Sequence, residues 1–287
     1  MKKIMRKSLL HKSGVEYADF SLNHVEGCAH GCMYPCYAFN MAKRFGKVKT
    51  YKEWITPKIV GNALELLDKE IPRFRREIKF VHLCFMTDPF MFGQKFKEVG
   101  DMTLKIIEKL NKNNIRCTVL TKGLLPKVLT NTEKYRKINE YGITLVSTDE
   151  NFRKRYEPNS AHFKKRIEAL RYLHDKGLKT WVSMEPYPTQ NIVEQDLLQL
   201  LKQVSFVDKI IFGKLNYNVK VSESIGNKEF YENRANLVID FCKKYKIDYH
   251  IKYGTQERDN KKTQVIFTPK RSLLDYTLQN RPIACPQ

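Results

Sequence analysis

Strand-like runs of apolar residues recur at seven places along the chain. Each run is only a few residues long, which suits a strand buried in a sheet better than a helix. The runs are residues 18–24, 79–86, 115–121, 142–148, 178–185, 209–216 and 247–253. They predict a sheet of six or seven strands.

Between these runs, apolar residues recur at the spacing of an amphipathic helix. Met102, Ile106, Ile107 and Leu110 share one helical face. Similar faces are formed by Ile59, Ala63, Leu66 and Leu67; by Phe163, Ile167, Leu170 and His174; by Val193, Leu197, Leu200, Leu201 and Val204; and by Phe230, Leu237, Val238 and Phe241. Strands that alternate with helices predict parallel β–α–β units and therefore an α/β fold.

The units follow one another without an obvious linker, which favours a single open or closed (β/α) barrel. We expect a barrel domain over residues 1–254 and a partly irregular tail over 255–287, packed on the barrel or extending from it. In such folds the catalytic groups lie at the carboxyl ends of the strands and in the loops that follow them.

The composition is that of an ordinary globular protein, with 42% hydrophobic and 29% charged residues among 287. The longest apolar runs are of strand length, so no membrane span is expected. The first residues lack the pattern of a signal peptide, which predicts a cytoplasmic protein.

The formal net charge of +21 is the most unusual bulk property. It favours acidic partners, above all DNA or RNA, whose phosphates bind Lys and Arg with release of counterions. The alternative is a lysine-rich, solvated surface, and an acidic redox partner protein is compatible with either interpretation.

Three of the seven cysteines, Cys28, Cys32 and Cys36, lie close together directly after the first predicted strand. An odd number of cysteines without an export signal argues against a disulfide framework. A zinc site would need His30 as its fourth ligand, at a spacing that suits a tetrahedral site poorly. Three thiolates suit an iron–sulfur cluster that keeps one iron open for a substrate or cofactor.

The segment "FSLNHVEGCAHGCMYPCYA" resembles the cluster loop of the radical S-adenosylmethionine (radical SAM) superfamily, whose usual spacing is C-x3-C-x2-C. More narrowly, it is similar to the "SLNPYxGCxHGCxYCYA" pattern of spore photoproduct lyase-like proteins, often labelled DNA repair photolyases. One inserted residue, Pro35, makes the spacing here C-x3-C-x3-C. We expect that the cluster survives this insertion and that Tyr34 is displaced.

Further segments extend the resemblance over most of the first 190 residues. "CFMTDPF" (84–90) matches the "TDP" segment of the family, and "VLTKG" (119–123) matches its Thr-Lys pair at a strand end. The stretch from "LVSTDENF" to "SMEPYP" (145–188) matches another family segment. The resemblance implies a partial (β/α)6-type radical SAM barrel with parallel strands and a C-terminal extension.

The resemblance also implies the cofactors. Cys28, Cys32 and Cys36 would bind a [4Fe–4S] cluster whose open iron is chelated by S-adenosylmethionine. Reductive cleavage would yield a 5′-deoxyadenosyl radical that takes a hydrogen atom from the substrate. The enzyme would be of lyase or transferase type, with flavodoxin or ferredoxin as its low-potential electron donor.

Further site residues follow from the same resemblance. Tyr34 corresponds to the aromatic residue near the adenine, Thr87 and Asp88 to the site of the amino group, and Lys122 to the partner of the methionine carboxylate. Ser147 would bind the same carboxylate or the ribose. Local alternatives remain for each: loop packing for Tyr34, a turn for Asp88, a solvated surface position for Lys122 and a cap for Ser147.

Three residues concern the substrate side. Glu185 would bind cofactor or substrate, or hydrogen-bond a loop. Tyr37 lies where the lyase has a tyrosine that relays the radical. Cys84 lies one residue from the position of the lyase's cysteine hydrogen donor, an offset that turns a strand side chain to the opposite face, so we expect a buried thiol.

Three functions therefore remain open. The first is a radical SAM enzyme of the photolyase-like group acting on DNA or RNA. The second is radical modification of a peptide, protein or small molecule. The third is a non-catalytic iron–sulfur protein that binds nucleic acid, which would leave Thr87, Asp88 and Lys122 without a role.

Overall fold

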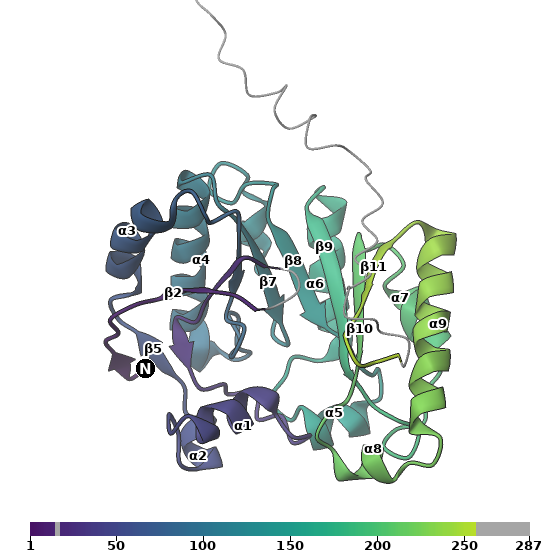
Figure 1. Ribbon diagram of the computed structural model, residues 1–287. Helices are drawn as coiled ribbons and strands as arrows, with labels where there is room; N and C mark the ends of the chain where they lie inside the picture. The colour runs from purple at the N-terminus through teal and green to yellow at the C-terminus, as the bar shows by residue number, and fades with distance from the viewer. Residues whose placement is uncertain (15–17, 257–287) are drawn as a thin grey trace, which may run out of the picture.

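An eight-stranded sheet forms the centre of the computed structural model, which describes residues 1–14 and 18–256 (Figure 1). Its strands lie in the order β2, β3, β6, β7, β8, β9, β10 and β11. Their bounds are Leu10–Lys12 (β2), Phe20–Leu22 (β3), Phe80–Leu83 (β6), Arg116–Thr121 (β7), Glu140–Thr144 (β8), Lys179–Tyr187 (β9), Lys209–Lys214 (β10) and Asp248–Ile251 (β11). All pairs are parallel except β2 with β3. Each of the seven strands predicted from the sequence is therefore present.

The register of the parallel pairs brings the strand ends to one edge of the sheet. Leu83 pairs with Val119, and Thr121 pairs with Ile143. The residues that follow β6, β7 and β8 consequently leave the sheet at the same edge, where the chemistry of an α/β fold is expected.

A smaller three-stranded sheet lies beside the main one, with β5 (Lys58–Val60) between β1 (Lys3–Ile4) and β4 (Val25–Glu26). Ile59 belongs to β5, so its predicted place on a helical face with Ala63 is wrong. Pairing of Lys3 with Ile59 and of Val25 with Ile59 overrides the helical spacing.

Nine α-helices connect the strands in the described part of the chain. Their bounds are Tyr37–Arg44 (α1), Tyr51–Trp54 (α2), Ala63–Phe74 (α3), Lys97–Lys112 (α4), Glu150–Tyr156 (α5), Phe163–Asp175 (α6), Leu197–Gln203 (α7), Val219–Glu223 (α8) and Asn227–Tyr245 (α9). Helices α3, α4, α6 and α9 flank the sheet, whereas α1, α5 and α8 lie together at one end of it, at the bottom of the view in Figure 1. Short 3₁₀ helices cover Gln94–Phe96 and Lys127–Thr130.

Local sequence sets several helix ends. The side chains of Asp149 and Asp196 accept hydrogen bonds from backbone N–H groups in the first turns of α5 and α7. The cap at Asp196 begins α7 later than predicted, so Val193 lies before the helix rather than on its face. Gly177, with φ 76°, ends the turn after α6, as glycine commonly does.

The core lies between the sheet and its flanking helices. Val119, Ile143 and Val182 on neighbouring strands are fully buried. Gly142 in β8 leaves room for the Trp181 indole, because a Cβ atom at Gly142 would lie 2.4 Å from that ring.

The fold is thus α/β with a mostly parallel sheet, as predicted. Among the described residues, no helix is both long and apolar enough to cross a membrane. The predicted tail from 255 onward lies outside the described residues except for its first two positions. The domain boundary at 254 therefore stays a prediction.

Candidate active site

A cavity of about 690 Å³ opens at the carboxyl edge of the main sheet. Its walls come from the cluster loop, which we define as residues 27–36, from the carboxyl-terminal half of β9, and from the ends of β6, β7 and β10 with the segments that follow them. Of the site residues predicted from the sequence, all but Ser147 line this cavity: Cys28, Cys32, Tyr34, Cys36, Tyr37, Thr87, Asp88, Lys122 and Glu185. Its volume lies within the range of ligand sites in proteins.

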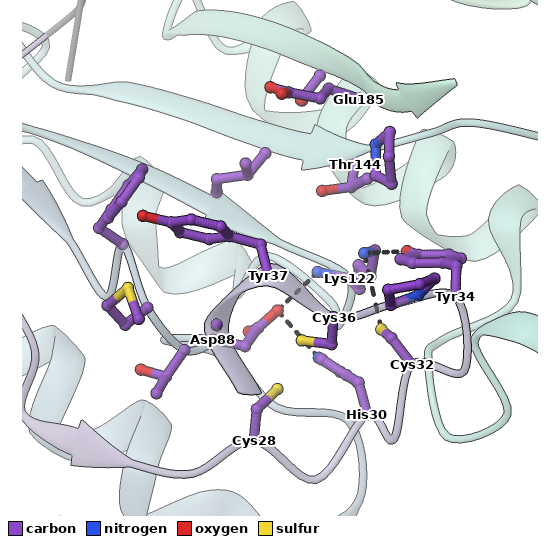
Figure 2. Close-up of a pocket in the computed structure, with 18 of the residues that line it drawn as sticks. Cys28, His30, Cys32, Tyr34, Cys36, Tyr37, Asp88, Lys122, Thr144 and Glu185 are labelled. Carbon is purple, nitrogen blue, oxygen red and sulfur yellow. Dashed lines mark hydrogen bonds and ion pairs between the residues drawn. The ribbon is translucent and has the colours of Figure 1, made fainter. Parts of the chain in front are cut away.

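The three predicted cluster ligands face the cavity together (Figure 2). Cys28, Cys32 and Cys36 are free thiols, each partly exposed. Burial raises the pKa of Cys28 well above its usual range and that of Cys32 to about 11, so iron must displace their protons on binding. Cys36 is the N-cap residue of α1.

The three free thiols form a donor set that suits an iron–sulfur cluster. Among the described residues, no three His, Cys, Asp or Glu side chains come close enough together to hold one metal ion. A cluster places each thiolate on a different iron, so its protein ligands lie farther apart. The donor set is thus three thiolates, as an iron–sulfur cluster with an open iron requires.

Two glycines give the cluster loop its path. Gly27 and Gly31 have φ values of 85° and 63°, in the left-handed region that favours glycine. Gly27 also passes close to the end of α2, because a Cβ atom there would lie 2.5 Å from the Trp54 carbonyl oxygen. The Cys28 amide donates to that same oxygen at 2.9 Å.

Asn159, between α5 and α6, holds the cluster loop from the other side. Its side-chain amide donates to the Ala29 carbonyl at 3.1 Å, and its backbone N–H donates to the His30 carbonyl at 3.2 Å. The Met33 amide donates to the Tyr156 carbonyl at 2.9 Å. Sequence reasoning missed Asn159, because nothing in the local pattern indicates that it contacts a loop so distant in the chain.

The Asp88 carboxylate ties the cluster loop to the ends of β6 and β7. It accepts hydrogen bonds from the Phe90 amide (2.8 Å), the Thr121 hydroxyl (2.7 Å) and the Lys122 amide (2.8 Å). Its Oδ2 also lies 2.9 Å from His30 Nε2. Burial alone would raise the pKa of Asp88, but His30 and these hydrogen bonds lower it, so the group stays ionised. Because its oxygens are already engaged, Asp88 here positions the loop.

Lys122 carries its charge into a buried network beside Cys32. Its Nζ lies 3.7 Å from Cys32 Sγ and 3.4 Å from Glu157 Oε1, and it hydrogen-bonds the Tyr34 hydroxyl. Tyr34 donates to Glu157 Oε1 at 2.8 Å, and Arg166 pairs with Glu157 Oε2 at 3.2 Å. Burial alone would lower the pKa of Lys122, but Cys32 and Glu157 outweigh it and raise that pKa. Any contact of Lys122 with a cofactor carboxylate must therefore exchange with one of these partners.

Glu157 and Arg166 were also missed, because they fall in a basic stretch (153–166) that suggests a nucleic-acid surface. Arg166 is only 1% exposed. A signal for its burial does exist in the sequence, since Arg166 lies on the apolar face of α6 between Phe163 and Leu170. Burial alone would raise the pKa of Glu157, but the charges of Lys122 and Arg166 outweigh burial and lower that pKa to about 2.

Thr87 and Ser147 are the other two residues that were predicted to bind S-adenosylmethionine. The Thr87 hydroxyl is half-buried and contacts the Val25 carbonyl at 3.5 Å. Ser147 lies outside the residues that line the cavity, and its hydroxyl accepts a hydrogen bond from the Asp149 amide at 3.1 Å. The geometry of Ser147 is therefore that of the local cap named as its alternative.

Cys84 is buried, as expected, but not for the expected reason. β6 ends at Leu83, and Cys84 has φ 57°, so the alternation of faces does not continue through it. The thiol lines the cavity and lies 3.3 Å from His24 Nδ1. Burial raises the pKa of Cys84 to about 12 and lowers that of His24 to about 4, so both groups are neutral.

The far side of the cavity combines one acid with two lysines. Figure 2 shows Glu185 across the cavity from the cysteines, with Tyr37 between them. Lys214 and Lys252 line the same part of the wall. Gly213 leaves room for these chains, because a Cβ atom there would lie 3.0 Å from Glu185 and 2.9 Å from Lys252.

Comparison with known proteins assigns this arrangement to a family. A family model described as the radical SAM superfamily matches residues 22–202, which include the cluster loop and all the predicted site residues. The chain belongs to the radical SAM superfamily. As a radical SAM protein it binds a [4Fe–4S] cluster and S-adenosylmethionine, and the three converging thiols fit the cluster.

Two relatives have sequences similar to this radical SAM protein. An uncharacterised protein of Acidianus two-tailed virus is 25% identical over 81% of this chain and 82% of its own length. An uncharacterised protein of Methanocaldococcus jannaschii is 28% identical over 64% of this chain and 66% of its own length.

Solved structures of spore photoproduct lyase share the fold. The complex with dinucleoside spore photoproduct has a TM-score of 0.63 at 13% identity, covering 88% of this chain and 81% of the lyase. A mutant lyase with bound AdoMet has a TM-score of 0.62 at the same identity and coverage.

Proposed function

We propose that this radical SAM enzyme acts on nucleic acid. The observation that carries the proposal is the outer part of the cavity, where Lys214, Lys252 and Tyr217 line the wall together. Tyr217 is 76% exposed, so its ring is open for stacking. Cations that meet phosphates, next to aromatic rings that stack on bases, are the usual features of nucleic-acid sites. The net charge of +21 supports the same partner.

The cysteines and Tyr37 have separate roles in this proposal. Cys28, Cys32 and Cys36 hold the cluster. Bound together, the cluster and S-adenosylmethionine would supply radical chemistry for removing a hydrogen atom from the substrate. Tyr37, 45% exposed and edge-on to Phe85 at 6.3 Å, lies between the cluster and the substrate side.

The reaction type follows less directly from the site. Spore photoproduct lyase has been solved with a dinucleoside lesion, which favours repair or modification of a base by a lyase-type reaction here as well. We also propose an acidic, low-potential electron donor such as flavodoxin or ferredoxin, which a basic surface would attract. A cytoplasmic location would keep the three free thiols reduced.

The test combines turnover with binding. Anaerobically reconstituted enzyme, given reductant and S-adenosylmethionine, should form 5′-deoxyadenosine. Single-stranded DNA or RNA should stimulate its formation, and gel shifts should weaken steeply as salt rises.

The matched variants change one lysine at each end of strand β10. Lys214→Met should weaken binding and reduce the salt dependence. Lys209→Met, at the opposite end of β10, should change neither. Turnover without any response to nucleic acid, and no gel shift at low salt, would instead favour a peptide or small molecule as substrate.

A further inference from the structure

The ammonium group of Lys122 lies against the sulfur of a cluster ligand. Its Nζ is 3.7 Å from Cys32 Sγ, and its other two partners are the Tyr34 hydroxyl and Glu157 Oε1, the latter at 3.4 Å. The Lys122 side chain is only 15% exposed. Its charge is therefore balanced by buried groups rather than by solvent.

The backbone fixes this contact in place. The Lys122 amide donates to Asp88 Oδ2 at 2.8 Å, and the Lys122 carbonyl accepts from the Ala161 amide at 2.9 Å. Glu157, 2% exposed, is held in turn by Arg166 at 3.2 Å. The Lys122–Glu157 pair thus has a fixed position beside Cys32, before any cofactor enters.

An electron added to the cluster makes it more negative, and a fixed charge nearby favours or opposes that change. Hydrogen bonds to cluster sulfurs and local charge are two of the features that set the potential of an iron–sulfur centre. In a buried site, where the effective dielectric constant is low, a charge a few ångströms away has a strong effect. We propose that the Lys122–Glu157 ion pair sets the reduction potential of the cluster through Cys32.

The two members of the pair act with opposite signs. Loss of the Lys122 ammonium removes a positive charge and an N–H···S contact, so the cluster becomes harder to reduce. Loss of the Glu157 carboxylate leaves Lys122 and Arg166 as uncompensated positive charges, so the cluster becomes easier to reduce. A purely structural role would not give shifts of opposite sign, because either variant would break the same ion pair.

The test is an EPR-monitored redox titration of the reconstituted full-length protein, without S-adenosylmethionine. Omitting that cofactor separates the proposal from a role of Lys122 in binding the methionine carboxylate. Lys122→Met should lower the midpoint and Glu157→Gln should raise it. Each should change the ratio of reduced to oxidised cluster about tenfold at a fixed potential, which corresponds to about 59 mV for one electron.

Two controls accompany these variants. Lys122→Arg keeps the charge and should stay near the wild-type midpoint. Lys209→Met breaks a partly buried ion pair, with Glu140, at the amino ends of β10 and β8, and should not shift the midpoint.

The outcomes against the proposal are distinct from failure of the proposed function, because no substrate is used. Shifts of the same sign in Lys122→Met and Glu157→Gln, or unchanged midpoints at full iron content, overturn it. If Lys122→Met loses its iron, the midpoint of Glu157→Gln decides the test: a higher midpoint supports the proposal and a lower or unchanged one overturns it. If both lose their iron while Lys209→Met keeps it, the pair serves cluster assembly and the proposal is wrong.

Discussion

His30 and Asp88 join the cluster loop to the sheet. His30 lies between two cluster cysteines in the sequence, and its Nε2 is 2.9 Å from the Asp88 carboxylate. The same carboxylate accepts hydrogen bonds from the Lys122 amide and the Thr121 hydroxyl. This contact couples the position of the thiols to the ends of β6 and β7. The cluster loop is therefore held by tertiary contacts as well as by its own sequence.

Asp88→Asn should loosen the loop and reduce cluster retention. The Asp88 carboxylate now faces His30 Nε2 and the Lys122 N–H with acceptor oxygens. The asparagine side chain would turn its NH2 group, a donor, towards one of these two groups. Breaking one member of a buried pair of this kind costs about 3 kcal/mol. Unfolding by urea of the cluster-free protein and iron per chain after reconstitution measure the two effects.

The control for Asp88→Asn is Asp196→Asn, because asparagine caps a helix about as well as aspartate does. It should leave both the iron content and the stability close to wild type. Normal iron content in Asp88→Asn would contradict the role given to Asp88.

Cys32→Ala should fail to hold the cluster, whereas Cys84→Ala should keep it. Both thiols line the cavity, but Cys84 lies beside His24 and belongs to another segment of the wall. Iron analysis and the visible absorption of the reconstituted proteins check this difference. Equal loss in both variants would mean that Cys84 is a ligand and that the ligand set is misassigned.

Deletion of Pro35 should impair cluster assembly, although it restores the usual C-x3-C-x2-C spacing. Tyr34 is held by Glu157 at 2.8 Å on one side of Pro35, and on the other side the Cys36 carbonyl accepts a hydrogen bond from the Asn40 amide of α1 at 3.0 Å. A shorter loop must break one of these contacts. Pro35→Ala keeps the length and should retain about four irons per chain. If the deletion variant alone assembled a cluster, the native loop would not be a cluster loop.

Stability of the cluster-free protein should fall as the pH falls from 6.5 towards 4. Burial lowers the pKa of His24 to about 4 and that of His82 to about 3, so the folded protein does not bind these protons in that range. The unfolded chain binds them near 6.5, and protons therefore favour unfolding. Each histidine contributes up to about 1.4 kcal/mol per pH unit.

Urea unfolding at several pH values across that window checks this slope. His24→Asn should flatten it, and substitution of the exposed His11 by Gln should not. A His24→Asn protein with the wild-type slope would show that another group carries the dependence.

Local patterns in the sequence were sufficient for much of the site. The seven strands, the position of Cys28, Cys32 and Cys36 after the first of them, and the strand-end positions of Asp88 and Lys122 all follow from patterns within a few residues. Parallel strands in register place such residues at one edge, which is why the cavity collects all the predicted side chains but Ser147.

Contacts between distant segments decided the rest. Ile59 lies in a strand because it pairs with Lys3 and Val25. Cys84 does not follow the alternation of strand side chains because β6 ends one residue before it. Glu157 and Arg166 look like part of a basic surface along the chain, yet Glu157 pairs with both Lys122 and Arg166 in the interior. The sequence alone determined which groups could hold the cluster, because thiol chemistry and strand order are local properties. Only the tertiary structure decided which charges lie beside Cys32, because burial and pairing depend on contacts between residues far apart in the chain, such as Lys122 and Cys32, which are 90 positions apart.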